Sequence, residues 1–390
     1  LNSNLLEDCI RRMKQLGLVT IEEMPDIKPD PEDPQKIDIT VKLKELNRQM
    51  INFNIGYSGY DGWFVAAGYS TQNFLGSGES LSLSVQTGSR AKSYRISFSE
   101  PYVFNSPATF GIDLYRTNYD YGNSMFKQRT TGFSLSGSVR FWRYFGFSLN
   151  YSFDNVGIYD VAEEYLNNIN TNEYYLDMLA NRRISTVSPT LYYNTVDSPI
   201  FPSSGFKLLG NYKISGSFLG GNTNMHRVHL ELVKFQPMIK RHVLGFRTVY
   251  EYVKPFGDGS WILPWYQRCR IGGEMDIRGF EIYDVGPYHS GSYKSSYSDG
   301  GNKCFYMNVE YRIPLTEQFS LALFYDMGNA YKSGNAINFK DLYTSTGAEI
   351  KIYVPMLGVP FRLIFAYNPR VVRKEDSKWE FRFAIGPSFY

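Results

Sequence analysis

Apolar and polar residues alternate along most of the chain, from Leu46 to the C-terminus. In the first such segment Ile51, Phe53, Ile55 and Tyr57 occupy every second position. Neighbouring side chains of a strand point to opposite faces, so this period of two predicts strands with one apolar and one polar face. We count about 16 such segments, an even number, as closed bacterial membrane barrels have. Their expected starts are residues 50, 62, 79, 91, 107, 128, 144, 184, 205, 222, 240, 304, 318, 342, 360 and 379.

Connections between the expected strands alternate between short and long. Gly76–Gly78 and Pro314–Thr316 are short turns, whereas residues 160–183 form a longer loop with a predicted helical stretch around residues 175–179. This asymmetry is typical of a barrel that has a periplasmic side and an outer side.

Composition narrows the choice of protein class. No window approaches about 18 uninterrupted apolar residues, so a membrane-spanning helix is not expected. Aromatic residues nonetheless make up 17% of the chain, and such side chains favour water–lipid boundaries. A soluble sandwich or propeller also alternates, but aromatic residues on one strand face favour lipid. The prediction is a mainly β protein, a 16-stranded antiparallel transmembrane β-barrel. The net charge of +3 does not indicate nucleic-acid binding.

Residues 1–47 follow a different pattern, and we assign the barrel to residues 48–390. One helix and one hairpin bury little core, so this first part is interpreted as the back half of a small α+β module. Because the chain starts at Leu1 without a methionine or signal peptide, we expect it to be a piece of a longer precursor. The expected elements are a helix over 4–16, a strand over 20–24, a Pro/Asp-rich turn over 26–35 and a strand over 37–44.

The longest connection is a polar segment from Gly257 to Lys303. Loops of that length are uncommon unless they are functional or disordered. At its centre Gly272, Gly273 and Gly279 permit sharp backbone bends on either side of Arg278. Two interpretations stay open: a surface loop with a solvated arginine, or a loop tip that turns inward and places Arg278 on buried carboxylates.

Two acidic residues on neighbouring strands are the candidate partners of Arg278. Glu310 and Asp326 each fall opposite the aliphatic face of their strand, so both are expected to point into the barrel lumen. The turn near Leu315 is expected to place them roughly four rungs apart, about 13 Å. A forked guanidinium can bridge two carboxylates. The alternative is that each carboxylate pairs with other basic groups of the lumen or with water.

No motif predicts a catalytic residue, a cofactor or a metal site. His226 and His229 are three apart in a predicted strand, so they point to opposite faces and cannot bind one metal side by side. There is no Gly-x-Ser-x-Gly elbow and no clear His or Cys dyad. Cys269 and Cys304 lie at the borders of the long loop, where they can form a disulfide or stay unpaired.

The centre of the long loop, Ile277, Arg278, Gly279 and Phe280, resembles the (V/I)RG(F/Y) motif of the BamA family of outer-membrane protein assembly factors. Residues 1–47 resemble the end of the last POTRA module of that family. The chain departs from the family pattern in having only part of one POTRA module, and Cys269 where an aromatic residue is expected. Further similar stretches are Asn73–Gly78, Ser99–Tyr102, Asp197–Gly205 and Phe324–Gly328.

The resemblance implies a 16-stranded barrel with a weak seam between its first and last strands. It implies that Arg278 contacts lumenal acidic residues, with Glu310 and Asp326 in the matching places. The implied function is to fold and insert other β-barrel proteins into the outer membrane, without nucleotide hydrolysis. The implied partners are the lipid bilayer, unfolded outer-membrane β-barrel clients and accessory lipoproteins, with the POTRA module in the periplasm. The alternatives are a polypeptide-exporting transporter of the same superfamily, or a passive porin.

The two ends of the predicted barrel would meet at this seam. Gly386 weakens strand preference and Pro387 removes a backbone donor, so the end of the last strand is expected to pair poorly. An unpaired edge can template the strand of an incoming client. The alternative is that this Gly-Pro pair merely ends the barrel. The candidate seam residues are Ile51, Phe53, Ile55, Tyr57, Phe381, Phe383, Ile385, Gly386, Pro387 and Phe389.

Overall fold

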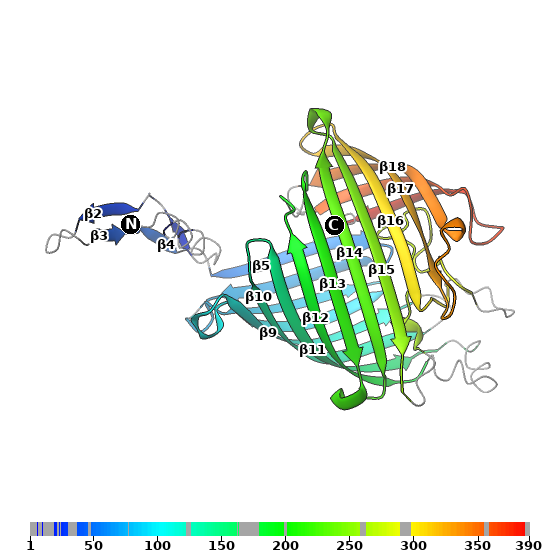
Figure 1. Cartoon of the computed structure of the whole chain (residues 1–390), viewed down its shortest axis with the longest axis horizontal. Coiled ribbons are helices and arrows are strands. Elements are labelled where there is room, and N and C mark those ends of the chain that lie inside the picture. Colours follow the sequence, from blue (N-terminus) through cyan, green and yellow to red (C-terminus); the bar gives the residue numbers. More distant parts are fainter. Residues whose placement is uncertain are drawn as a thin grey trace.

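A single sheet of 16 strands curls into a barrel in the computed structural model (Figure 1). The structure describes residues 48–76, 78–121, 126–161, 163, 179–198, 201–257, 263–288, 298–354 and 359–386, and before them residues 6, 10, 19–21, 23, 25–29 and 37–45. The strands are β5 (Gln49–Ser58), β6 (Gly62–Gln72), β7 (Ser80–Gly88), β8 (Ala91–Glu100), β9 (Ala108–Asp120), β10 (Lys127–Arg140), β11 (Phe145–Tyr159), β12 (Arg182–Asn194), β13 (Gly205–Ser215), β14 (Met225–Pro237), β15 (Val243–Pro255), β16 (Lys303–Pro314), β17 (Phe319–Tyr331), β18 (Tyr343–Val354), β19 (Val359–Tyr367) and β20 (Trp379–Ile385).

Each of these strands pairs antiparallel with the next one along the chain, so the order in the sheet is the order in the sequence. The prediction of a 16-stranded antiparallel barrel is confirmed, and no expected strand start lies more than three residues from the observed one. The described parts of the connections contain five short 3-10 helices: η1 (Val103–Asn105), η2 (Ser217–Leu219), η3 (Ile239–Arg241), η4 (Trp265–Gln267) and η5 (Phe339–Asp341). Among the described residues, no helix is long and apolar enough to cross a membrane.

The two faces of the sheet differ as the sequence alternation predicts. On β16 every second side chain from Cys304 to Arg312 is buried, whereas the side chains between them are partly exposed. On the outer face large apolar side chains are exposed, among them Phe53 and Leu323. The barrel therefore has an apolar outer surface and a polar lumen, which is the arrangement that lipid requires of a spanning barrel.

The chain before the barrel contains two small strand pairs. Strand β1 (Val19–Ile21) pairs with β4 (Leu43–Glu45), and β2 (Asp26–Pro29) pairs with β3 (Ile37–Thr40). Figure 1 shows them beyond the end of the barrel at which β5 begins. The expected helix over 4–16 lies almost wholly outside the described residues.

Two expectations for this part of the chain are wrong. The stretch from Asp26 to Pro29 is a strand and not part of a turn, because Ile27 pairs directly with Ile39 in a hairpin. Residues 37–44 form two strands that pair with different partners, and not one continuous strand. Local turn propensity was overridden here by pairing between the apolar positions.

The long connection between β15 and β16 folds back into the barrel. We call its longest described part, residues 263–288, the lumenal loop. Its buried apolar side chains, such as Ile271 and Val285, form one core cluster with wall residues that include Val253 and Tyr306. The interpretation of this segment as a solvated surface loop is therefore wrong.

The connection between β11 and β12 contributes to a second cluster in the lumen. Leu179 is buried there with Tyr121, Phe126 and Trp265. The rest of the helical stretch predicted around residues 175–179 lies outside the described residues.

Candidate functional site

The tip of the lumenal loop is a tight turn that its glycines make possible. Gly272 and Gly273 have φ angles of +120° and +100°, which are strained for residues with a side chain. A Cβ atom on Gly272 would lie 2.3 Å from the carbonyl oxygen of Glu281. The Gly273 amide donates to the Phe280 carbonyl at 3.0 Å, which closes the turn. The residues between them, Arg278 included, are thereby held at the tip.

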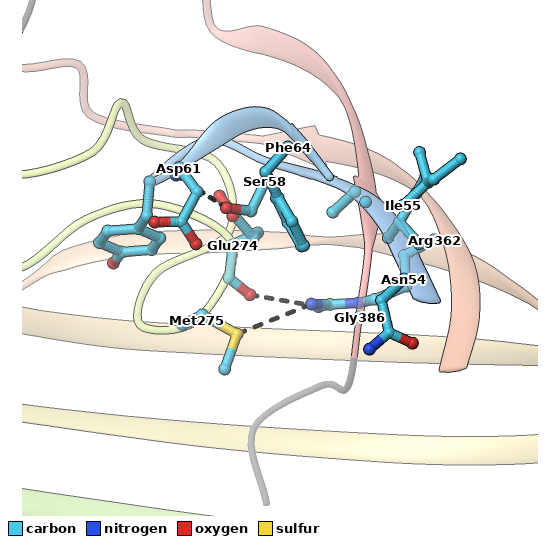
Figure 2. A pocket seen from close by; sticks show the side chains of 13 residues that line it. Asn54, Ile55, Ser58, Asp61, Phe64, Glu274, Met275, Arg362 and Gly386 are labelled. Atoms are coloured by element: carbon cyan, nitrogen blue, oxygen red, sulfur yellow. Dashed lines mark hydrogen bonds between the residues drawn. The ribbon is translucent and has the colours of Figure 1, made fainter. Parts of the chain in front are cut away.

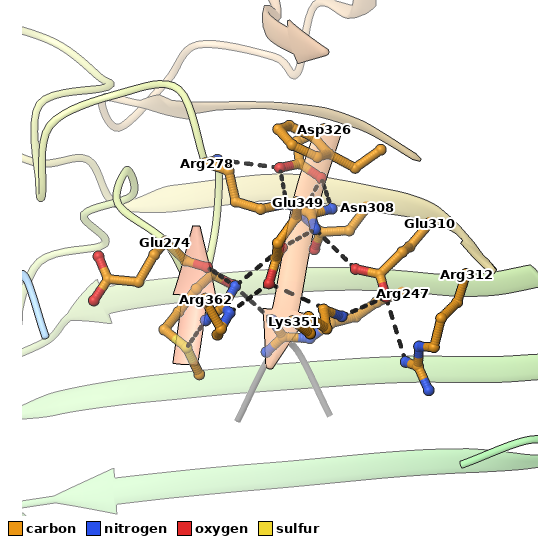
Figure 3. A network of polar contacts seen from close by, with 12 residues as sticks. Arg247, Glu274, Arg278, Asn308, Glu310, Arg312, Asp326, Glu349, Lys351 and Arg362 are labelled. Carbon is orange, nitrogen blue, oxygen red and sulfur yellow. Dashed lines mark hydrogen bonds and ion pairs between the residues drawn. The ribbon is translucent and has the colours of Figure 1, made fainter. Parts of the chain in front are cut away.

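The side chain of Arg278 is buried among three carboxylates (Figure 3). Its Nε and Nη2 atoms donate to Asp326 at 2.8 and 2.9 Å, and its backbone amide donates to the same residue at 3.1 Å. Its Nη1 atom donates at 2.8 Å to both Glu310 and Glu349. The guanidinium also lies 3.9 Å from the ring centre of Phe324. The loop tip therefore sits directly on the walls formed by β16, β17 and β18.

Glu310 and Asp326 are closer along the sheet than the sequence predicted. Glu310 is paired with Phe324, and Asn308 is paired with Asp326. The two carboxylates are therefore two rungs apart, not four, which corresponds to about 7 Å along the strands. The expected spacing was wrong because Pro314 pairs with Ser320, which centres the turn near residue 317 and not near Leu315. The shorter spacing is what allows one guanidinium to reach both.

Apart from Arg312 on β16, three further participants in this network were not predicted: Glu349, Lys351 and Arg362. Arg362 of β19 donates from Nε to Glu349 at 2.6 Å, and Lys351 of β18 donates to Glu310 at 2.6 Å. All three side chains are buried. A signal was present, because Glu349 and Lys351 alternate with Ala348 and Ile350 on one strand, as Glu310 alternates with aliphatic residues on β16.

These groups form a lumenal ion-pair network with nearly balanced charge. Four cations face three carboxylates, and every ion pair between them is buried. Burying single charges costs much more than burying paired and hydrogen-bonded ones. The network therefore stabilises the loop only while it is complete. Its members are Arg278, Glu310, Arg312, Asp326, Glu349, Lys351 and Arg362.

The first and last strands meet without a backbone ladder among the described residues. Their contact includes Tyr57 and Phe383, whose rings stack with centres 5.9 Å apart. On β5 every residue from Gln49 to Ile55 is exposed, although the strand pairs with β6 along its whole length. We call this meeting of β5 and β20 the seam.

The remaining predicted seam residues fall into different environments. Phe381 is exposed on the outer face, but Ile385 is buried. Gly386 has a φ of +146°, and its amide still donates to Pro360 of β19 at 3.0 Å. The ladder to β19 therefore continues through the glycine that was expected to weaken it. Pro387 and Phe389 lie outside the described residues.

A cavity of about 560 Å³ lies beside the seam (Figure 2). Its walls come from β5 and β6, from the lumenal loop, and from β19 and β20. Residues of each group are Ile55, Phe64, Glu274, Arg362 and Ile385.

Cys269 and Cys304 are free and buried, so no disulfide ties the lumenal loop to β16. Within the described parts of the chain, no group of three or more His, Cys, Asp or Glu side chains could hold a metal ion.

Comparison with known proteins places this geometry in context. Residues 73–389 match the model of the Omp85 superfamily domain. The outer membrane protein assembly factor BamA of Nitratidesulfovibrio vulgaris is 26% identical over 386 residues, 97% of this chain and 46% of that protein. The chain thus spans about half the length of the relatives it matches.

Solved structures give the same barrel. The crystal structure of Haemophilus ducreyi BamA lacking POTRA domains 1–3 superposes with a TM-score of 0.80 at 20% identity, covering 99% of this chain and 79% of that one. CdiB from Acinetobacter baumannii superposes less well, with a TM-score of 0.59 at 14% identity, covering 96% of this chain and 67% of that one.

Proposed function

This chain belongs to the Omp85 superfamily, and on that premise we propose that it folds and inserts client β-barrel proteins into the outer membrane. The relative from N. vulgaris is named an outer membrane protein assembly factor. We extend that role to this chain because the barrel carries the structural feature that such work needs, a sheet edge at which a second strand can pair.

The exposed edge of β5 is the observation that carries the proposal. Residues Gln49–Ile55 are exposed, and no backbone ladder joins β5 to β20 among the described residues. An unpaired strand presents a row of donors and acceptors that templates another strand. In lipid the need for such pairing is greater, because no water is present to satisfy a free backbone group. A client strand that arrives unfolded would therefore gain its hydrogen bonds at this edge.

The lumenal ion-pair network serves this function by fixing the loop inside the barrel, in our proposal. Arg278 binds side chains of three successive strands, β16 to β18. The half of the barrel that ends in β20 is thus held as a rigid unit while the seam remains the weak part. No residue acts as a catalyst in this scheme, and no nucleotide, metal or other cofactor takes part.

The same proposal places the barrel in the outer membrane. Residues 1–47 would be the end of a periplasmic POTRA module, and residues 48–390 the membrane domain. The partners would be the lipid bilayer, unfolded β-barrel clients and accessory lipoproteins. The occupied lumen argues against a passive porin, because the lumenal loop packs buried side chains across it.

Reconstitution with a client tests the proposal. The purified chain in liposomes should accelerate the folding of an urea-unfolded outer-membrane barrel, measured as the appearance of its compact, heat-modifiable form on a gel. Liposomes that contain an unrelated barrel of similar size are the control. Equal folding rates in both would contradict an assembly function. Conductance of small solutes without folding activity would favour a porin, and passage of an unfolded polypeptide into the liposome would favour an exporter.

A further inference from the structure

The lumenal loop is bonded to both sides of the seam. Between Gly272 and Asp284 it makes hydrogen bonds or ion pairs to the β5–β6 turn and also to residues on or next to β19 and β20. The two strands that meet at the seam have no ladder of their own among the described residues. Polar connection between the ends of the sheet therefore runs through the loop.

On the first side, the loop holds the turn between β5 and β6. The amide of Gly59 donates to the Glu274 carboxylate at 2.9 Å, and the Tyr60 hydroxyl donates to the Gly272 carbonyl at 2.9 Å. The turn is itself bonded to the neighbouring β7–β8 turn, because Arg90 donates to the Gly59 carbonyl at 2.6 Å. Movement of this turn would therefore carry the first strands with it.

The fit at Gly59 is close. A Cβ atom at that position would lie 2.5 Å from Ile282 and 2.8 Å from the Glu274 carboxylate. The side chain of Glu274 is buried, and Figure 2 shows it between the β5–β6 turn and Arg362. A buried carboxylate that accepts a backbone amide makes one of the stronger hydrogen bonds in proteins.

On the last side, several contacts attach the same loop to residues on or next to β19 and β20. Arg362 of β19 donates to the backbone carbonyl of Glu274 at 3.1 Å. Asn368 donates to the Gly279 carbonyl at 2.5 Å, and Arg382 of β20 pairs with Glu281 at 3.1 Å. Glu274 thus contacts both sides of the seam. Its carboxylate accepts from the β5–β6 turn, and its backbone carbonyl accepts from Arg362 of β19.

We propose that Glu274, with Tyr60, is a positioning residue that holds the seam closed from inside the lumen. The pair of bonds from Glu274 to Gly59 and from Tyr60 to Gly272 is called the lumenal latch. Parting the seam requires the β5–β6 turn to leave Glu274, and the cavity beside it provides space on that side. The use of such opening for client insertion rests on the function proposed above, but the latch itself does not.

The sequence of the turn suits this arrangement. Gly59 leaves room for the carboxylate, and Tyr60 provides a hydroxyl that donates to the Gly272 carbonyl. The loop is also fixed to β16, β17 and β18 by the Arg278 contacts, which do not involve β5 or β6. Release of the latch should therefore free the first strands while the loop stays on β16 to β18.

Distance measurement across the seam tests the latch without any client. Spin labels would be attached at Phe53→Cys and Phe381→Cys, both exposed on the outer face, after the three native cysteines are replaced by serine. Glu274→Ala should raise the population with long distances about tenfold, the effect of losing a hydrogen bond to a charged group. Glu274→Gln keeps an acceptor oxygen and should restore most of the native distribution. Tyr60→Phe should open the seam by a smaller factor.

Hydrogen exchange provides a second measurement on the same variants. The Gly59 amide should exchange about tenfold faster in Glu274→Ala and close to the native rate in Glu274→Gln. Asp341→Ala is the matched control, because it removes a carboxylate from a half-exposed ion pair with Arg370 away from the seam. It should change neither measurement. If Glu274→Ala folds poorly, Tyr60→Phe alone carries the test.

Two results would overturn the latch: unchanged distances and exchange in Glu274→Ala and Tyr60→Phe, or opening in Glu274→Gln as large as in Glu274→Ala. Client folding is then measured separately. A seam that opens with no change in client folding leaves the latch standing and counts against the proposed function. If the seam of Glu274→Ala stays closed and this variant still accelerates client folding, the result counts against the latch alone.

Discussion

Arg278 and Asp326 are joined by three hydrogen bonds, two from the guanidinium at 2.8 and 2.9 Å and one from the backbone amide at 3.1 Å. The side chain of Asp326 is fully buried, and Asn308 donates to it at 2.9 Å. Asp326 thus fixes both the backbone and the side chain of the loop tip. A planar fork that matches both carboxylate oxygens is specific to arginine among the cationic side chains.

Replacing Arg278 by alanine should destabilise the barrel by about 3–5 kcal/mol, because it leaves buried carboxylates unpaired. Arg278→Lys should restore only part of this loss, since a single ammonium group cannot form the fork with Asp326 and also reach Glu310 and Glu349. The measurement is the urea midpoint of unfolding in detergent micelles, followed by gel mobility without boiling.

Arg370→Ala is the matched control for this change. Arg370 pairs with Asp341 at 2.6 Å, but both side chains are about half exposed. Exposed pairs contribute about 0–1 kcal/mol, so its midpoint should stay near the native value. Equal midpoints for Arg278→Ala and the native protein would contradict a structural role for the network.

Gly279→Ala should destabilise the barrel although alanine adds only a methyl group. A Cβ atom there would lie 1.9 Å from Asn368 and 2.3 Å from Ser345, so the loop must move away from β18 and β19. Overpacking of this kind costs about 1–3 kcal/mol. Gly137→Ala, on β10, has no atom within 4 Å of the added carbon and should leave the unfolding midpoint nearly unchanged. The expectation fails if the two substitutions have the same effect.

Asp276 gives the loop a dependence on pH. It lies in the lumenal loop, outside the spanning strands, and burial raises its pKa from 3.8 to about 6, partly offset by Arg247. Because the folded pKa is above the unfolded one, the folded protein binds the extra proton. The contribution of Asp276 to stability is therefore fully present below about pH 4 and is lost as the pH rises through about 6.

Asp276→Asn removes this loss, because the amide never ionises. Relative to the native protein, the variant should gain stability between about pH 4 and pH 8, by on the order of 3 kcal/mol. Urea unfolding at a series of pH values measures the difference. A difference that stays constant with pH would show that Asp276 does not titrate in this range.

Locking the seam should stop client insertion while the fold is kept. Tyr57 and Phe383 stack across the seam with ring centres 5.9 Å apart, so cysteines at these positions can be joined by a short bis-maleimide in a background without native cysteines. The joined protein should keep its heat-modifiable mobility but lose its acceleration of client folding. A monofunctional maleimide on the same variant is the control and should leave activity intact. Full activity in the joined form would count against a gate at this seam.

Much of the lumenal site could be predicted from alternation alone. Glu310 and Asp326 each stand between two apolar or aromatic residues, so a period of two is enough to turn them inward. The same pattern on β18 points Glu349 inward, and it was available in the sequence. What alternation does not contain is the register between strands, because a shift of the pairing leaves each strand's own pattern unchanged. The separation of Glu310 and Asp326 was therefore predicted wrongly.

The contact between Glu274 and Gly59 has no comparable signal. The two residues are 215 positions apart in the sequence, and neither belongs to a strand. Their meeting depends on how far the barrel curls and on how deep the loop enters, which are properties of the whole sheet. Likewise the sequence predicted that Gly272 and Gly273 permit a sharp bend. It did not predict that the Glu281 carbonyl would occupy the space beside Gly272.

The exposed edge of β5 has a consequence for how a guest strand would begin to pair. The exposed part of β5 already has its other edge fully bonded to β6, so its backbone is ordered before any second chain arrives. Only the arriving segment has to give up conformational freedom, about 1–2 kcal/mol for each residue fixed. Growth of the sheet from this edge would therefore need no new nucleus, because the edge strand is already ordered.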